Sequence, residues 1–193
     1  MKIAALLLAA GSSRRFGSDK RKVQLGAGRT LLATSLQLYL YAFGHCFVVI
    51  DEDDGALKPD LLQQGGTPVE LPGRERGYGM GDSLAAGIKH IAGQRYDACL
   101  VGLADMPWVK PNTLAALASA LAEAPLVVPV WRGHRGHPVG FAACYFPELG
   151  QLGGDRGARG LLQRHASELV QLPVEDPGIL QDVDTVVDLW RRP

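Results

Sequence analysis

Small and basic residues crowd directly behind the first apolar run of the chain. The run Ile3–Ala9 is followed by Ala10, Gly11, Ser12 and Ser13, and then by Arg14, Arg15 and Lys20. Glycine lets backbone N–H groups approach an anion closely, arginine can donate two hydrogen bonds to a phosphate, and lysine adds a compact charge. The segment predicts a phosphate site. Contacts to the phosphorylated ligand are expected from Ala9 to Ser13, and charge stabilisation from Arg14, Arg15 and Lys20.

Two common phosphate motifs do not fit this segment. Lys20 is followed by Arg21 where a Walker A motif has Ser or Thr, and no G-x-G-x-x-G follows the first apolar run. The alternative for the segment alone is a surface loop with solvated basic side chains.

An aspartate follows a second buried run. Ala98–Leu103 is followed by Ala104, Asp105, Met106 and Pro107, and Pro107 prevents the strand from continuing. A carboxylate at the end of a buried strand is well placed for Mg²⁺, which prefers oxygen ligands and commonly shares them with substrate phosphates. The alternative is a helix cap, but the next helix is expected only near Pro111.

Further carboxylates lie close to the end of the sequence. If the backbone is extended there, Asp182 and Asp184 face the same side, so that both are candidate metal ligands with Asp105. Thr185 and Asp188 are spaced as in a capping box. In the alternative to the metal role, Asp182 is solvated and Asp184 caps the helix that follows.

The remaining candidates lie in glycine-rich stretches. Gly79 and Ser83 precede a predicted helix, where Ser83 either contacts a base or caps the helix. Arg156 and Arg159 are spaced to bind a phosphate near a helix start. His137 precedes Pro138 and either orients a bound ligand or holds its own loop in place.

Short apolar runs that alternate with amphipathic ones must position these residues. The runs typical of buried parallel strands are Ile3–Ala9, Cys46–Ile50, Ala98–Leu103 and Leu126–Val130, and the helical spacings are Leu31–Ala42, Ala56–Gln64, Ser83–Ala92 and Thr113–Ala124. This order predicts an α/β fold, an open and mostly parallel Rossmann-like sheet with helices on both faces. Such sheets bind ligands at the carboxyl ends of their strands.

Glycine and proline become dense after Val130, which predicts a small β-hairpin insertion near residues 130–142. A strand-like Ser167–Leu172, a short run Ile179–Asp184 and a helix from about Thr185 are expected to follow. The 193 residues are interpreted as a single domain, 1–193.

Five segments resemble one known family. Leu8 to Lys20 matches, without a gap, the signature of the MobA-like nucleoside-triphosphate transferases, whose fold is of the nucleotide-diphospho-sugar transferase type. Residues 102–107 resemble the metal motif of that group, 77–87 its base-contacting segment, and 135–141 and 153–159 the acceptor segments of its molybdenum cofactor branch. The resemblance implies that the first loop wraps a triphosphate. The pair Ala9-Ala10 before Gly11 is similar to the CTP-using members, closest to molybdenum cofactor cytidylyltransferase.

The resemblance implies a Mg²⁺-dependent transfer of CMP from CTP to the terminal phosphate of molybdopterin, with release of pyrophosphate. A same-fold transferase that uses GTP or a sugar-phosphate acceptor is one alternative. The other is a non-catalytic nucleotide-binding assembly factor. Transient contact with a client molybdoenzyme is also expected.

Composition narrows the class of partner. Twenty basic and twenty acidic residues give zero formal net charge, which speaks against a nucleic-acid or membrane-surface partner. The first apolar run is too short to cross a bilayer. Cys46, Cys99 and Cys144 lie far apart, as expected of reduced, buried thiols in a cytoplasmic protein.

Overall fold

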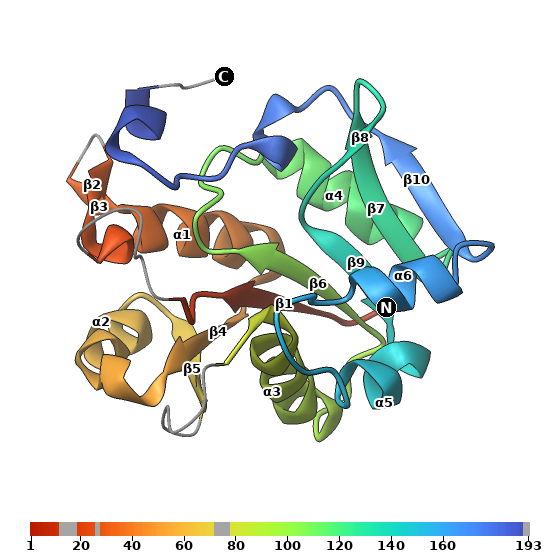
Figure 1. Ribbon diagram of the computed structural model, residues 1–193, viewed down its shortest axis with the longest axis horizontal. Coiled ribbons are helices and arrows are strands. Elements are labelled where there is room, and N and C mark those ends of the chain that lie inside the picture. The colour runs from red at the N-terminus through yellow and green to blue at the C-terminus, as the bar shows by residue number, and fades with distance from the viewer. Residues whose placement is uncertain (12–18, 26–27, 72–77, 191–193) are drawn as a thin grey trace.

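The computed structural model describes residues 1–11, 19–25, 28–71 and 78–190. Its centre is an eight-stranded sheet with the order β10-β7-β9-β6-β1-β4-β5, and β8 pairs with β7 (Figure 1). The strands are β1 (Ile3–Leu8), β4 (Cys46–Asp51), β5 (Gly66–Leu71), β6 (Ala98–Leu103), β7 (Leu126–Trp131), β8 (His134–Arg135), β9 (Val139–Ala142) and β10 (Leu169–Pro173). β1, β4, β5 and β6 are mutually parallel, as are β7 and β10, whereas β9 runs antiparallel to both β6 and β7. The predicted open, mostly parallel sheet is confirmed.

The central strands are apolar on both faces because each face carries its own core. Ala4 and Leu6 of β1 pack into one cluster of buried residues, whereas Ala5 and Leu7 pack into the other. This alternation follows from the two-residue period of a strand. A continuous apolar run is therefore what a strand covered on both sides requires.

Helices cover both faces of the sheet, as the sequence predicts (Figure 1). On one face lie α1 (Leu31–Phe43) and α4 (Pro111–Ala120), and on the other lie α3 (Met80–Ala92), α5 (Phe146–Leu149) and α6 (Arg159–Arg164). α2 (Lys58–Gln63) packs beside β5. Thr30 caps α1 by accepting a hydrogen bond from the Ala33 N–H at 3.1 Å, and Gly44 ends that helix with a φ of 71°.

The inserted hairpin near 130–142 is present as β7 and β8, and β9 then pairs antiparallel with β6 and β7 in the same sheet. A separate two-stranded sheet, β2 (Gln24–Leu25) with β3 (Arg29–Thr30), precedes α1. Short 3₁₀ segments occupy Lys20–Lys22, Glu52–Leu57 and Ala143–Tyr145, and the second is kinked at Asp54.

Two expectations for the last residues are wrong. Residues 181–184 are not a strand, and the helix expected from Thr185 is a short 3₁₀ turn, Val186–Trp190; another 3₁₀ turn spans Pro177–Leu180. In the part of the chain that the structure describes, no strand pairs with residues 181–184. A ladder of backbone hydrogen bonds therefore does not stabilise an extended conformation there.

All three cysteines are free thiols. Cys46 and Cys99 are buried as expected, but Cys144 is exposed. None of the helices in the described part of the chain has the length and apolar character needed to cross a membrane.

Candidate functional site

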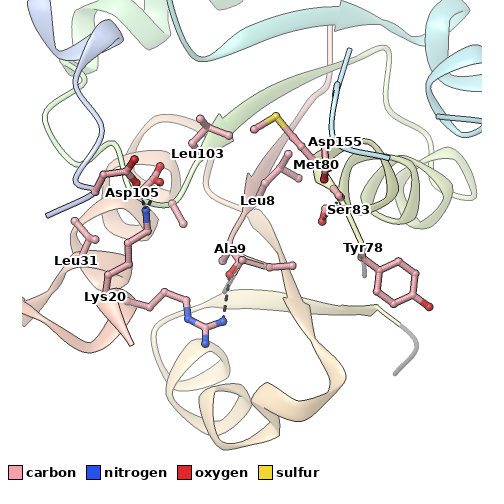
Figure 2. A pocket seen from close by; sticks show the side chains of 16 residues that line it. Leu8, Ala9, Lys20, Leu31, Tyr78, Met80, Ser83, Leu103, Asp105 and Asp155 are labelled. Atoms are coloured by element: carbon pink, nitrogen blue, oxygen red, sulfur yellow. Dashed lines mark hydrogen bonds and ion pairs between the residues drawn. The ribbon is translucent and has the colours of Figure 1, made fainter. Parts of the chain in front are cut away.

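The site lies at the carboxyl edge of β1 and β6. These strands are paired in parallel up to Leu8 and Leu103, so the residues that follow each strand emerge side by side. The Ala104 N–H donates to the Leu8 carbonyl at 3.1 Å, which holds the two strand ends together. A cavity of about 450 Å³ opens here. Its lining is Leu8, Ala9, Ala10, Gly11, Lys20, Arg21, Leu31, Tyr78, Gly79, Met80, Ser83, Leu103, Ala104, Asp105, Asp155 and Asp184 (Figure 2).

Lys20 lies between two of the predicted carboxylates. Its Nζ is 2.7 Å from Oδ2 of Asp105 and 3.0 Å from Oδ1 of Asp184. Burial alone would lower the pKa of Lys20, but the two carboxylates together raise it above its ordinary value. Lys20 is therefore held as a charged ammonium at the cavity wall (Figure 2).

Three carboxylates gather at this point. One oxygen each from Asp105, Asp182 and Asp184 lies within 4.8 Å of the others. Oδ1 of Asp105 is buried and has no hydrogen-bond partner among the residues that the structure describes. Burial raises the pKa of Asp182, and the charges of Asp184 and Asp105 raise it further. A hard divalent cation would relieve this repulsion and use the unpaired oxygen, so the donor set fits Mg²⁺.

Asp182 and Asp184 reach the site although their backbone is not a strand. The Val183 N–H donates to the Asp105 carbonyl at 2.9 Å, which fixes the segment against the end of β6. Asp188 accepts the N–H of Thr185 at 2.8 Å, so the predicted capping interaction exists. Asp188 thus performs the capping, and Asp184 faces Lys20.

Arg21 is a member of the site that the sequence reasoning missed. Its guanidinium binds Asp19 and Asp54, and Nη1 donates to the Ala9 carbonyl at 3.2 Å. Burial opposes the charge, but the two carboxylates outweigh it and raise the pKa of Arg21. Its position directly after Lys20 was the available signal, because a residue beside a predicted ligand shares its turn.

Gly79 and Ser83 both line the cavity, but their main contacts are structural. Oγ of Ser83 donates to the Gly79 carbonyl at 3.2 Å, and Ser83 is buried. The Gly79 N–H donates to Asp82 in the first turn of α3 at 2.9 Å, so Asp82 satisfies the first backbone donor of the helix. The sequence allows Ser83 either to contact a base or to cap the helix. In the structure, its hydroxyl forms a hydrogen bond within the first turn of the helix.

His137 lies behind the carboxylates and does not line the cavity. Its N–H donates to the Ile179 carbonyl at 2.9 Å, which ties its loop to the segment that leads to Asp182. Burial lowers the pKa of His137, and a hydrogen bond to Val101 and the charge of Asp105 oppose that shift only in part. The hydrogen bond of the ring to the Val101 backbone supports the alternative in which His137 holds its own loop in place.

Arg156 and Arg159 are exposed and neither lines the cavity. The neighbouring Asp155 does. The predicted residues Ser12, Ser13, Arg14 and Arg15 lie outside the described part of the chain.

Comparison with known proteins decides the family. Residues 5–169 match the model of the MobA-like NTP transferase domain. The chain belongs to this family.

Relatives of this MobA-like transferase span several named functions. It is 29% identical over 203 residues to the purine catabolism protein PucB of Bacillus subtilis, covering 98% of this chain and 96% of PucB. It is 34% identical over 120 residues to a probable molybdenum cofactor guanylyltransferase of Chloroflexus aggregans, covering 61% of this chain and 53% of that protein. Among solved structures, Rv0371c of Mycobacterium tuberculosis superposes with a TM-score of 0.85 at 27% identity, covering 98% of this chain and 96% of Rv0371c.

Proposed function

We propose that this MobA-like transferase moves CMP from CTP to the terminal phosphate of molybdopterin and releases pyrophosphate. The observation that carries the proposal is the Lys20 ammonium held between Asp105 and Asp184 at the edge of a nucleotide-sized cavity. This arrangement places one cation, the Lys20 ammonium, beside a group of carboxylates that can bind a second cation, a metal ion. Both are needed where negative phosphates must approach each other.

The reaction needs no protein nucleophile. An oxygen of the acceptor phosphate forms a bond to the α-phosphorus of CTP, the bond from that phosphorus to the bridging oxygen breaks, and pyrophosphate leaves with the electron pair. Asp105, Asp182 and Asp184 would hold Mg²⁺, which would supply charge neutralisation to the phosphates. Lys20 binds and orients the triphosphate, and Arg21 keeps the end of β1 in place through the Ala9 carbonyl.

CTP is favoured over GTP by Ala10, whose methyl group lines the cavity just after β1. The molybdopterin acceptor is supported by the likeness of residues 135–141 and 153–159 to acceptor segments of the molybdenum cofactor branch. It is also supported by the relative named as a molybdenum cofactor guanylyltransferase. That relative is equally the reason to keep GTP as the second donor candidate.

Thermal stabilisation by each of CTP, GTP, ATP and UTP, with and without Mg²⁺, tests the donor directly. A nucleotide at about 100 times its Kd adds about 2.7 kcal/mol to the free energy of unfolding when it binds only the folded state. A Mg²⁺-dependent shift with CTP alone supports the proposal, and pyrophosphate release on adding molybdopterin completes it. A shift with GTP alone replaces the donor, and no shift with any nucleotide contradicts the proposal.

A further inference from the structure

The cavity wall opposite Asp105 is built from two segments packed without room for a side chain between them. A Cβ on Gly79 would lie 2.2 Å from the carbonyl carbon of Gly154, and one on Gly81 would lie 2.7 Å from the Gly153 oxygen. The Gly81 N–H also donates to the Gly154 carbonyl at 2.7 Å. The glycines at the start of α3 are therefore required for this packing, whether or not a ligand approaches them.

Asp82 joins the two segments. Its Oδ2 accepts the N–H of Gly79 and the N–H of Gly154, each at 2.9 Å. One carboxylate oxygen thus fixes the start of α3 and a segment 72 residues further along the chain. The next residue, Asp155, is held in the cavity as a consequence (Figure 2).

Asp155 is out of place in a cavity for phosphates. A carboxylate repels a triphosphate. None of the ion pairs in the described part of the chain includes Asp155. Lys20 lies with Asp105 and not with Asp155 (Figure 2). Asp155 therefore suits the part of a ligand that carries hydrogen-bond donors.

The surroundings of Asp155 indicate which donors. Met80 stands beside it with 42% of its surface exposed, and Leu8 and Leu103 add apolar surface to the same cavity (Figure 2). Apolar side chains suit the faces of a planar ring, and a carboxylate suits N–H groups on its edge.

We propose that Asp155 is a specificity residue that accepts a hydrogen bond from an amino-substituted nitrogen heterocycle, and that Asp82 is its positioning residue. The ring belongs either to the base of the nucleotide or to the acceptor. The inference rests on the proposed function, since it names the part of the substrate that this wall reads.

Asp155→Ala and Asp155→Asn test the proposal with CTP and UTP, which differ at position 4 by an amino group against a carbonyl. If the base is read, Asp155→Ala weakens CTP binding in the presence of Mg²⁺ by roughly ten- to a hundredfold, as for the loss of a charge-assisted hydrogen bond, and leaves UTP unchanged. Asp155→Asn then shifts the preference toward UTP, because its amide can donate to the carbonyl. If the acceptor ring is read, nucleotide affinities stay constant and the KM for molybdopterin rises at least about tenfold with little change in kcat.

Asp82 and a remote acid provide the controls. Asp82→Ala is expected to reproduce the effect of Asp155→Ala, whereas Asp82→Asn keeps an oxygen acceptor and stays near wild type. Glu123→Gln removes the same charge at an exposed position beyond α4 and is expected to change nothing. Nucleotide and acceptor constants within twofold of wild type in both Asp155 variants would overturn the inference, whereas a wild-type chain that binds no nucleotide overturns the proposed function itself.

Discussion

Asp105 is the residue on which we expect turnover to depend most directly. Asp105→Asn keeps the size of the side chain but removes the charge that pairs with Lys20 and belongs to the three-carboxylate group. We expect the fold to be retained and pyrophosphate release to fall by at least about a hundredfold, because charge neutralisation of the phosphates is lost. Asp97→Asn, before the opposite end of β6, is the matched control in the same assay. Wild-type turnover of Asp105→Asn contradicts the metal role.

Lys20 holds the carboxylates together while no divalent cation is bound. Lys20→Met removes the ammonium that lies 2.7 Å from Asp105. We expect nucleotide affinity to fall about tenfold or more through the lost charge-assisted contact, while affinity for Mn²⁺ alone rises because the carboxylates repel one another without a counter-charge. Calorimetric titration of CTP and of Mn²⁺ measures both.

Lys22→Met is the control for Lys20→Met. The Lys22 side chain is 59% exposed, and its Nζ lies 3.9 Å from Oδ2 of Asp19. The prediction assumes that the Lys20 ammonium and the divalent cation compete for the same carboxylates. Unchanged Mn²⁺ affinity in Lys20→Met would contradict that assumption.

At the scale of elements, α3 and the segment 153–157 depend on their close contact. Gly79→Ala introduces a methyl group 2.2 Å from backbone atoms of Gly154, which cannot rotate away. We expect the free energy of unfolding to fall by about 1–3 kcal/mol in urea titrations, as for other overpacked sites. Gly55→Ala, where nothing lies within 4 Å, is expected to change stability by less than about 0.5 kcal/mol. Equal stability of the two variants contradicts this packing account.

α5 and α6 are linked by an ion pair that responds to pH. A hydrogen bond from Arg164 lowers the pKa of Glu148 below its ordinary 4.5, burial opposes that shift, and His165 adds to it. A lowered carboxyl pKa stabilises the fold above pH 4.5, and that stabilisation is lost as pH falls through the lowered value.

Glu148→Gln is therefore expected to reduce stability by about 0.5 kcal/mol at pH 7, a small amount because the pair is solvent-exposed. The difference from wild type should disappear in urea titrations at pH 3. A difference that is the same at both pH values assigns the effect to packing and not to charge.

The sequence predicted the central strands, whose faces both pack against helices, but it missed the edge strand β5. β1 and β6 are continuous apolar runs, so their positions followed from composition alone. β5 contains Thr67, Pro68 and Glu70 and lies at the edge of the sheet next to β4 only, where a proline without an N–H is tolerated. Its alternation is too weak to distinguish it from a loop. Asp82 and Asp155 were missed for another reason, because their relation is a tertiary contact that no local pattern reports.

At the scale of the whole molecule, the return of the chain from β10 to the site depends on Asp176. This residue is 1% exposed and accepts hydrogen bonds from the Lys110 N–H, the Thr113 hydroxyl and the Gly178 N–H, at 2.8, 2.6 and 2.9 Å. Asp176→Ala leaves these donors buried without an acceptor, so we expect about 2–4 kcal/mol of destabilisation in urea titrations.

Glu175→Ala is the control for Asp176, since it changes the exposed neighbouring side chain. Asp176→Ala is also expected to weaken Mn²⁺ binding, because Asp182 and Asp184 follow the segment that Asp176 anchors. Full metal affinity in this variant indicates that the carboxylates are positioned without it.

The ion pair between Lys20 and Asp184 joins positions 164 residues apart. During synthesis on the ribosome, the first strand and its loop emerge long before the carboxylates that complete the centre. If Asp105, Asp182 and Asp184 hold a divalent cation as proposed, a growing chain lacks two of these three ligands until residue 184 has left the exit tunnel. Truncation before Asp182 is therefore expected to abolish Mn²⁺ binding even though Asp105 is present.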